Sequence, residues 1–254
     1  MHRGDKLEKV IIIIPTYNER NNISIILNEL EIVFSKIKNY DMFVLVYDSD
    51  SSDNTAEVVR EYQQKFPNIY LQTEEKKSGL GSAYFQAMQY AIDTLHADFV
   101  FEFDADGSHR PEYLPPMMEA FKQGADVVMG SRYVPGGAIP KNWALNRKLL
   151  SVLGNVAARI MLSYKIKDYT TGFRGTRVSV LKKINWSDIK STGYAYKIHL
   201  MWLLYLLRVK IVEFPICFVD RKEGLSKLPK NNVLESLLLL FNLRLQRIMN
   251  FLFN

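Results

Sequence analysis

Two carboxylates separated by one residue follow an apolar run in the middle of the chain. The run ADFVFEF at 97–103 leads directly into Asp104 and Asp106, and Gly107 comes next. Carboxylates are rarely buried unless they are paired or bind a cation. Alternate strand residues point to opposite faces, so both carboxylates can reach one ion only where the strand ends in a turn, which Gly107 can supply. Two hard oxygen ligands suit Mg²⁺ or Mn²⁺, and the alternative is a solvated acidic turn before Pro111.

Polar residues also follow two other apolar runs. Tyr17 and Glu19 come directly after VIIIIP at 10–15, and Asp48 ends the run MFVLVYD at 42–48. Taken alone, the segment after Asp48 is equally consistent with a turn and a helix N-cap. In open α/β sheets, however, ligands bind at the carboxyl ends of the strands. The coincidence of three polar groups at predicted strand ends therefore indicates one site.

Basic residues next to glycine, serine and threonine form another group. Lys77 and Gly79 precede a predicted helix, whose N-terminal N–H groups favour an anion. Arginine guanidinium groups match the geometry of phosphate oxygens. Five basic residues lie in predicted loops or at element ends: Arg132, Arg147, Arg174, Arg221 and Lys227. Each alone is typical of a solvated surface, but together they indicate a phosphate-binding lobe that faces the acidic site.

Alternating strands and helices are needed to position these residues. Apolar runs predict strands at 10–15, 42–48, 68–74, 97–106 and 125–133. Helical spacing predicts helices between them at 22–37, 55–66, 81–95 and 111–124. This alternation predicts an α/β fold with a doubly wound, mostly parallel sheet and flanking helices.

The pattern changes after residue 135. We expect a loop at 134–146, helices at 147–164 and 196–208, a turn followed by a helix at 168–184, and a strand at 210–219. The segment 233–253 predicts a helix that is apolar on most of its circumference. Either an amphipathic helix in a membrane interface or a helix packed on the core or on a partner subunit fits this composition.

Composition narrows the class of protein. The 254 residues are 48% apolar and 24% charged, which allows a sizeable core in one large α/β domain or two small ones. The net charge of +6 is compatible with a phosphorylated ligand or an anionic membrane. The aromatic residues lie in apolar runs and do not alternate with a basic stripe, so we expect no nucleic-acid binding. The single Cys217 excludes an internal disulfide framework.

The order of the motifs resembles the dolichyl- or polyprenyl-phosphate mannosyltransferases of glycosyltransferase family 2. The resemblance is carried by IPTYNERNNI, YDSDSSDNT, KKSGLGSAY, DADGSHRPEYLP, GSRYVPGG, TTGFRG, TGYAY and EFPICFVDRKEGLSK. It implies a GT-A (Rossmann-like) catalytic domain at 1–229, and the composition of the remaining segment predicts a C-terminal amphipathic helix at 230–254. It also implies a peripheral enzyme on the cytoplasmic side of a membrane. That enzyme would use Mg²⁺ or Mn²⁺ to transfer mannose from GDP-mannose, with inversion, onto a polyprenyl phosphate.

Each motif implies roles by position. Pro15, Tyr17, Glu19 and Asp48 match the donor-nucleotide motif, and we add Lys77 and Gly79, which precede a helix. Asp104 and Asp106 match the metal and diphosphate motif, and with Arg132 they are the expected catalytic residues. The acceptor phosphate is assigned to Arg147, Ser151, Arg221, Ser226 and Lys227.

Three positions depart from the family pattern. Ser49 stands where a second acidic residue is common, Lys197 where glutamine is common, and His199 where glutamate is common. His199 could equally be a helix residue beside the core. Two alternatives therefore stay open. One is the same reaction with another donor, such as UDP-glucose. The other is a non-catalytic subunit that binds a lipid phosphate or a membrane-protein partner.

Overall fold

The computed structural model describes residues 7–189, 191, 193–219 and 232–253. Within them, one sheet has the strand order β3-β2-β1-β4-β6-β5-β7. The strands are β1 (Glu8–Thr16), β2 (Tyr40–Ser49), β3 (Ile69–Glu74), β4 (Phe99–Glu102), β5 (Val127–Ser131), β6 (Arg174–Arg177) and β7 (Ile211–Pro215). Every neighbouring pair is parallel except those of β6, which runs antiparallel to both β4 and β5. The predicted α/β fold with a mostly parallel sheet is confirmed.

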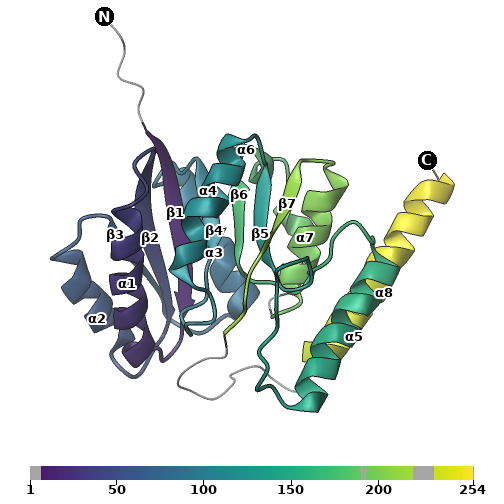
Figure 1. Cartoon of the computed structure of the whole chain (residues 1–254), viewed down its shortest axis with the longest axis horizontal. Coiled ribbons are helices and arrows are strands. Elements are labelled where there is room, and N and C mark those ends of the chain that lie inside the picture. The colour runs from purple at the N-terminus through teal and green to yellow at the C-terminus, as the bar shows by residue number, and fades with distance from the viewer. Residues whose placement is uncertain (1–6, 190, 192, 220–231, 254) are drawn as a thin grey trace, which may run out of the picture.

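Helices cover both faces of the sheet (Figure 1). They are α1 (Arg20–Phe34), α2 (Thr55–Gln63), α3 (Leu80–Asp93), α4 (Leu114–Lys122), α5 (Leu145–Met161), α6 (Val178–Leu181), α7 (Tyr196–Leu206) and α8 (Asn232–Phe253). Two short 3₁₀ helices, η1 (Pro111–Tyr113) and η2 (Trp186–Asp188), precede α4 and α7.

Strand β1 divides the core into two clusters. Ile11 and Ile13 pack in the cluster that contains α3 and α7, whereas Val10 and Ile12 pack in the cluster that contains α1 and α4. All four side chains are fully buried. This explains why the run reads as continuously apolar, because a central parallel strand buries both faces.

Strand β6 corrects the expectation of a turn followed by a helix at 168–184. Only the short helix α6 forms there, and Arg174–Arg177 pairs with β4 and β5 instead. Arg174 lies opposite Glu102 in the register and forms a buried ion pair with it. A strand held by an ion pair has no apolar run, so hydrophobic periodicity does not reveal it.

Helix α8 lies beside α5 at the edge of the molecule (Figure 1). Leu240 and Leu243 of α8 are buried at 3% exposure each, and Arg247 Nη1 donates a 3.0 Å hydrogen bond to the Leu162 carbonyl. No helix in the described part of the chain is long and apolar enough to cross a membrane. The helix predicted at 233–253 is confirmed, and it packs on the rest of the molecule with one side.

Candidate active site

The carboxyl ends of the central strands position the predicted site residues. Thr16 of β1 is in register with Asp48 of β2, and Ile13 of β1 is in register with Glu102, two residues before Asp104. A cavity of about 300 Å³ opens at this edge. Its polar lining includes Asp104, Asp106, Arg132, Arg147, Ser151 and Lys197. The structure thus brings the predicted acidic pair together with Arg147 and Ser151, two of the predicted acceptor-phosphate residues.

Asp104 is held by several donors. Tyr84 donates a 3.0 Å hydrogen bond to Asp104 Oδ1, and Lys197 Nζ lies 3.1 Å from each carboxylate oxygen. Burial alone would raise the pKa of Asp104, but the nearby positive charge, chiefly the Lys197 ammonium, and the hydrogen bonds from Lys197 and Tyr84 together outweigh it, so that the pKa lies well below its usual range. Gly107 has φ +76°, and this left-handed conformation makes the turn that was predicted after the strand.

His109 is a site residue to which the sequence assigned no role. Its Nδ1 accepts a 2.9 Å hydrogen bond from the Asp104 backbone N–H, and its ring stacks on Phe173 at 5.1 Å between centroids. Burial lowers the pKa of His109 to about 4. The imidazole is therefore neutral at pH 7 and fixes the backbone that carries Asp104. The only sequence signal was its position three residues after Asp106.

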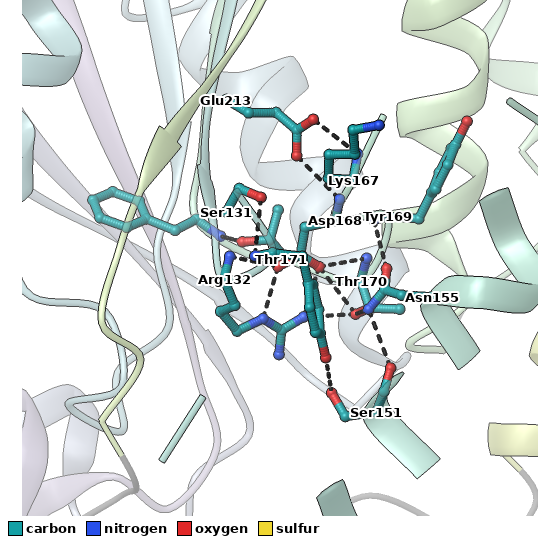
Figure 2. Close-up of polar contacts among 12 residues, drawn as sticks. Ser131, Arg132, Ser151, Asn155, Lys167, Asp168, Tyr169, Thr170, Thr171 and Glu213 are labelled. Carbon is teal, nitrogen blue, oxygen red and sulfur yellow. Dashed lines mark hydrogen bonds and ion pairs between the residues drawn. The ribbon is translucent and has the colours of Figure 1, made fainter. Parts of the chain in front are cut away.

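Arg132 is fixed by a carboxylate from the segment before β6 (Figure 2). Its Nε donates to Asp168 Oδ2 and its Nη2 to Asp168 Oδ1, each at 2.7 Å, and Nη2 also donates to Thr170 Oγ1 at 2.7 Å. Asp168 is fully buried and raises the pKa of Arg132 above an already high value, despite the opposing effect of burial. Such a fork is charged at any working pH and has a fixed plane.

Ser151 joins the same network from α5 (Figure 2). Its Oγ lies 2.8 Å from the Tyr133 hydroxyl, one turn of helix before Asn155, which donates a 2.9 Å bond to Thr170 Oγ1. Arg147, also on α5, is exposed and stacks at 4.0 Å on the ring of Trp143. Arg147 and Ser151, two of the five predicted acceptor-phosphate residues, therefore line the same cavity as Arg132.

The predicted donor-nucleotide residues lie at the same sheet edge but do not line this cavity. Asp48 accepts hydrogen bonds from the hydroxyls of Thr16 at 2.7 Å and Ser51 at 2.6 Å. Lys77 Nζ lies 3.5 Å from the centre of the Tyr17 ring. Three further residues of this group lie nearby in sequence: Pro15 is the penultimate residue of β1, and Glu19 and Gly79 are the N-cap residues of α1 and α3. Their assignment to the nucleotide remains a prediction.

The other predicted positions have varied outcomes. Arg174 is buried against Glu102, so it is not the surface phosphate ligand that the sequence suggested. His199 is 6% exposed on α7, and its Nδ1 has no hydrogen-bond partner among the described residues, which favours its interpretation as a core residue. The remaining acceptor-phosphate assignments lie outside the described residues: Arg221, Ser226 and Lys227.

The acidic turn fits a divalent cation that is shared with a ligand. Among the described residues, no three histidine, cysteine or acidic side chains gather as a complete metal site. Asp104 and Asp106 do offer hard carboxylate oxygens to the same cavity. Mg²⁺ and Mn²⁺ commonly bind one or two carboxylates and take their other ligands from phosphates and water. These two residues would therefore hold such an ion together with a diphosphate.

Comparison with known proteins places the chain in a family. The model of glycosyl transferase family 2 matches residues 11–185. Polyprenol monophosphomannose synthase of Mycolicibacterium smegmatis is 36% identical over 231 residues, which are 91% of this chain and 84% of that protein. Undecaprenyl-phosphate mannosyltransferase of Micrococcus luteus is 37% identical over 220 residues, which are 87% of each chain.

A solved structure shows the same fold. Glucosyl-3-phosphoglycerate synthase from Mycobacterium tuberculosis, in complex with Mn²⁺, UDP and glucosyl-3-phosphoglycerate, superposes with a TM-score of 0.65. The match covers 93% of this chain and 80% of that one at 15% identity, so it supports the architecture alone. The chain is therefore an enzyme with the GT-A fold that belongs to glycosyltransferase family 2.

Proposed function

We propose that the enzyme transfers mannose from GDP-mannose to the phosphate of a polyprenyl lipid. The observation that carries this proposal is the make-up of the cavity. Its lining combines two carboxylates, Asp104 and Asp106, with Arg132, Arg147 and Ser151. The lining also includes large apolar side chains: Trp143, Leu150, Phe218, Leu237 and Leu240. An ion–diphosphate, an acceptor phosphate and a hydrocarbon chain each have a matching surface, and the relatives named above carry this activity in their names.

The reaction needs positioning more than proton transfer. An acceptor phosphate oxygen attacks the anomeric carbon, the bond from that carbon to the diphosphate breaks, and the electron pair leaves with the nucleoside diphosphate. A phosphate is already anionic at pH 7, so no strong general base is required. Arg147 and Ser151 hold the acceptor, and Arg132 presents a rigid cation to the phosphates. Asp104 and Asp106 would hold a divalent ion, which would supply positive charge to neutralise the departing diphosphate.

The test is transfer from a panel of radiolabelled nucleotide sugars to a polyprenyl phosphate, with Mg²⁺, with Mn²⁺ and with EDTA. We expect metal-dependent transfer from GDP-mannose, a loss of about a thousandfold or more in Asp104→Asn, and no loss in the exposed control Asp41→Asn. Near-full activity of Asp104→Asn would contradict the role of this carboxylate. No transfer from any donor by folded protein would favour a lipid-phosphate-binding or partner-binding subunit.

A second donor is favoured by one observation. Ser49, which replaces a common acidic residue, is 5% exposed and hydrogen-bonds to Glu74 of β3. The polar groups at the end of β2 therefore differ from those of the family pattern. Transfer from UDP-glucose and not from GDP-mannose in the same panel would keep the mechanism and change the donor.

We also propose that α5 and α8 dock on the surface of an anionic membrane. Leucine, isoleucine and phenylalanine side chains four or seven residues apart are 49–60% exposed on both helices: Leu149, Leu153, Ile160, Leu237, Phe241 and Leu245. Exposed apolar faces on adjacent helices are typical of interfacial binding, and the acceptor lipid would enter the cavity from the same side.

Liposome flotation with anionic vesicles tests this docking. Deleting α8 would uncover the core around Leu240 and Leu243, so point variants are better suited. Leu153→Asp with Phe241→Asp should reduce flotation about tenfold. The control Ile32→Asp, at a 60% exposed position on α1, should float like the wild type. Equal flotation of the double variant would exclude the membrane and favour a partner subunit on these helices.

A further inference from the structure

Lys197 places a permanent cation on Asp104 of the acidic turn. It is the second residue of α7, and its side chain is 1% exposed. Its ammonium lies 3.1 Å from both carboxylate oxygens of Asp104, whose own side chain is 28% exposed to the cavity. The carboxylate that would hold a divalent ion is therefore already neutralised from the protein side.

Gly172 makes room for this arrangement. A methyl group at Gly172 would overlap Lys197 Nζ and would lie 3.1 Å from Asp104 Oδ2. The backbone at Gly172 thus approaches the ammonium closely, and Lys197 is among the residues that line the cavity. The aromatic rings of Tyr84 and Tyr194, with centroids 5.7 Å and 5.4 Å from Nζ, surround the same cation. These contacts therefore fix the position of the lysine side chain, and its charge lies against the carboxylate proposed to bind the metal.

A fixed ammonium at this distance must act on any divalent ion at the turn. Two cations that share one carboxylate repel each other, and this repulsion is strong where little water intervenes. A nucleoside diphosphate adds several negative charges, which attract the ion and compensate the ammonium. The metal and the nucleotide should therefore each strengthen the binding of the other, as reciprocal linkage requires.

We propose that Lys197 is a positioning residue that makes metal binding depend on the nucleotide. In the free enzyme it neutralises Asp104, so that the turn binds Mg²⁺ or Mn²⁺ weakly. When the nucleoside diphosphate binds, the ion is retained between the diphosphate and the two carboxylates. The inference rests on the proposed role of Asp104 as a metal ligand and adds the order in which the site is filled.

The experiment is a Mn²⁺ titration of the full chain, with free Mn²⁺ measured by electron paramagnetic resonance, without nucleotide and with GDP or UDP. Lys197→Met removes the charge and keeps most of the apolar stem. We expect it to bind Mn²⁺ alone about tenfold to a hundredfold more tightly than the wild type. We also expect the strengthening by nucleotide to shrink by a similar factor. Lys210→Met makes the same change of net charge at the start of β7, at the opposite sheet edge, and should titrate like the wild type.

Several outcomes would overturn the inference. Equal Mn²⁺ affinity of the wild type and Lys197→Met, with binding lost in Asp104→Asn, would show a structural ion pair and leave the metal site intact. Equal affinity in Asp104→Asn as well would remove the metal assignment itself. Lys197→Gln, which keeps hydrogen-bond donors without the charge, gives the same comparison if Lys197→Met does not fold. Circular dichroism of each variant confirms the fold before titration.

Discussion

Arg132 reaches the cavity with its guanidinium plane already set. Two bonds of 2.7 Å to Asp168 and one of 2.7 Å to Thr170 fix it before any ligand binds. A phosphate that binds such an arginine does not have to order a flexible side chain, so less binding free energy is lost. This arrangement also requires a fully buried anion, Asp168, whose charge is compensated by the arginine.

Removing one partner of this pair should therefore destabilise the fold. We expect Asp168→Ala to lower the free energy of unfolding by about 3–5 kcal/mol, because it leaves a buried charge unpaired. Urea unfolding at pH 7 measures the difference. The exposed pair of Arg110 and Glu112 provides the control, and Glu112→Ala should cost less than about 1 kcal/mol. A loss of stability in Asp168→Ala as small as that in Glu112→Ala would mean that solvent compensates the unpaired charge of Arg132.

Gly172 allows a sharper test, because a single added methyl group there would contact both Lys197 and Asp104. Gly172→Ala should push the Lys197 ammonium off Asp104 and reduce transfer activity about tenfold or more. Gly154→Ala, where a methyl group would meet nothing within 4 Å in the middle of α5, should instead raise helix stability by about 0.5–1 kcal/mol. Unchanged transfer in Gly172→Ala would show that Lys197 can move without consequence.

At this scale the sequence predicts which residues line the cavity better than it predicts what holds them in place. Asp104 and Asp106 were recognisable because polar residues follow an apolar run. The supports of the site were not, because Asp168 lies 36 residues from Arg132 and Lys197 lies 93 residues from Asp104. No local sequence pattern reveals that such distant residues are partners. Arg174 shows the opposite mistake, in which a residue was predicted as a ligand but has a structural role. Its motif resembles a phosphate-binding loop, but its partner is Glu102 on the neighbouring strand.

Among the elements, β6 is a strand that the hydrophobic periodicity of the sequence does not reveal. It lies between β4 and β5 in the middle of the sheet, yet it reads RGTR. The buried pair with Glu102 and the close approach of Gly175 to the Phe101 ring replace the usual apolar side chains. The strands and helices before residue 135 were predictable because each carries its own apolar period, whereas β6 depends on neighbours that are distant in sequence.

Helix α7 carries a buried histidine that should make stability depend on pH. Burial lowers the pKa of His199 below its ordinary value of 6.5, so the folded protein holds it neutral. The unfolded chain takes up this proton first as the pH falls below about 6.5, and the free energy of unfolding therefore falls with it. His199→Leu removes that contribution. Its stability relative to the wild type should rise between pH 7 and pH 5.

Chemical denaturation at several pH values measures this effect. At pH 8 both proteins are uncharged at this position, so the difference between them reports packing alone and serves as the reference. A constant difference from pH 8 to pH 5 would mean that the folded protein protonates His199 as readily as the unfolded chain does.

For the molecule as a whole, ligand binding should increase the free energy of unfolding. The carboxyl ends of β1, β2 and β4 and the loops that follow them form one edge of the sheet, so a ligand there ties separate segments together. Mn²⁺ with GDP, at one hundred times the dissociation constant, should raise the free energy of unfolding by about 2.7 kcal/mol. Thermal unfolding measures the shift. Asp104→Asn should show little of it, and an equal shift in that variant would place the ligand elsewhere.

The fit between Gly172 and Lys197 also has a consequence for how this sequence can change over time. A lysine at 197 can keep its ammonium on Asp104 only while position 172 has no side chain, since the two would occupy the same space. The reverse does not hold, because a glycine at 172 accepts many neighbours. A mutational path that keeps this ion pair intact therefore acquires the glycine before the lysine. Once the lysine is present, position 172 cannot gain a side chain without displacing the ammonium, whereas position 197 can still change.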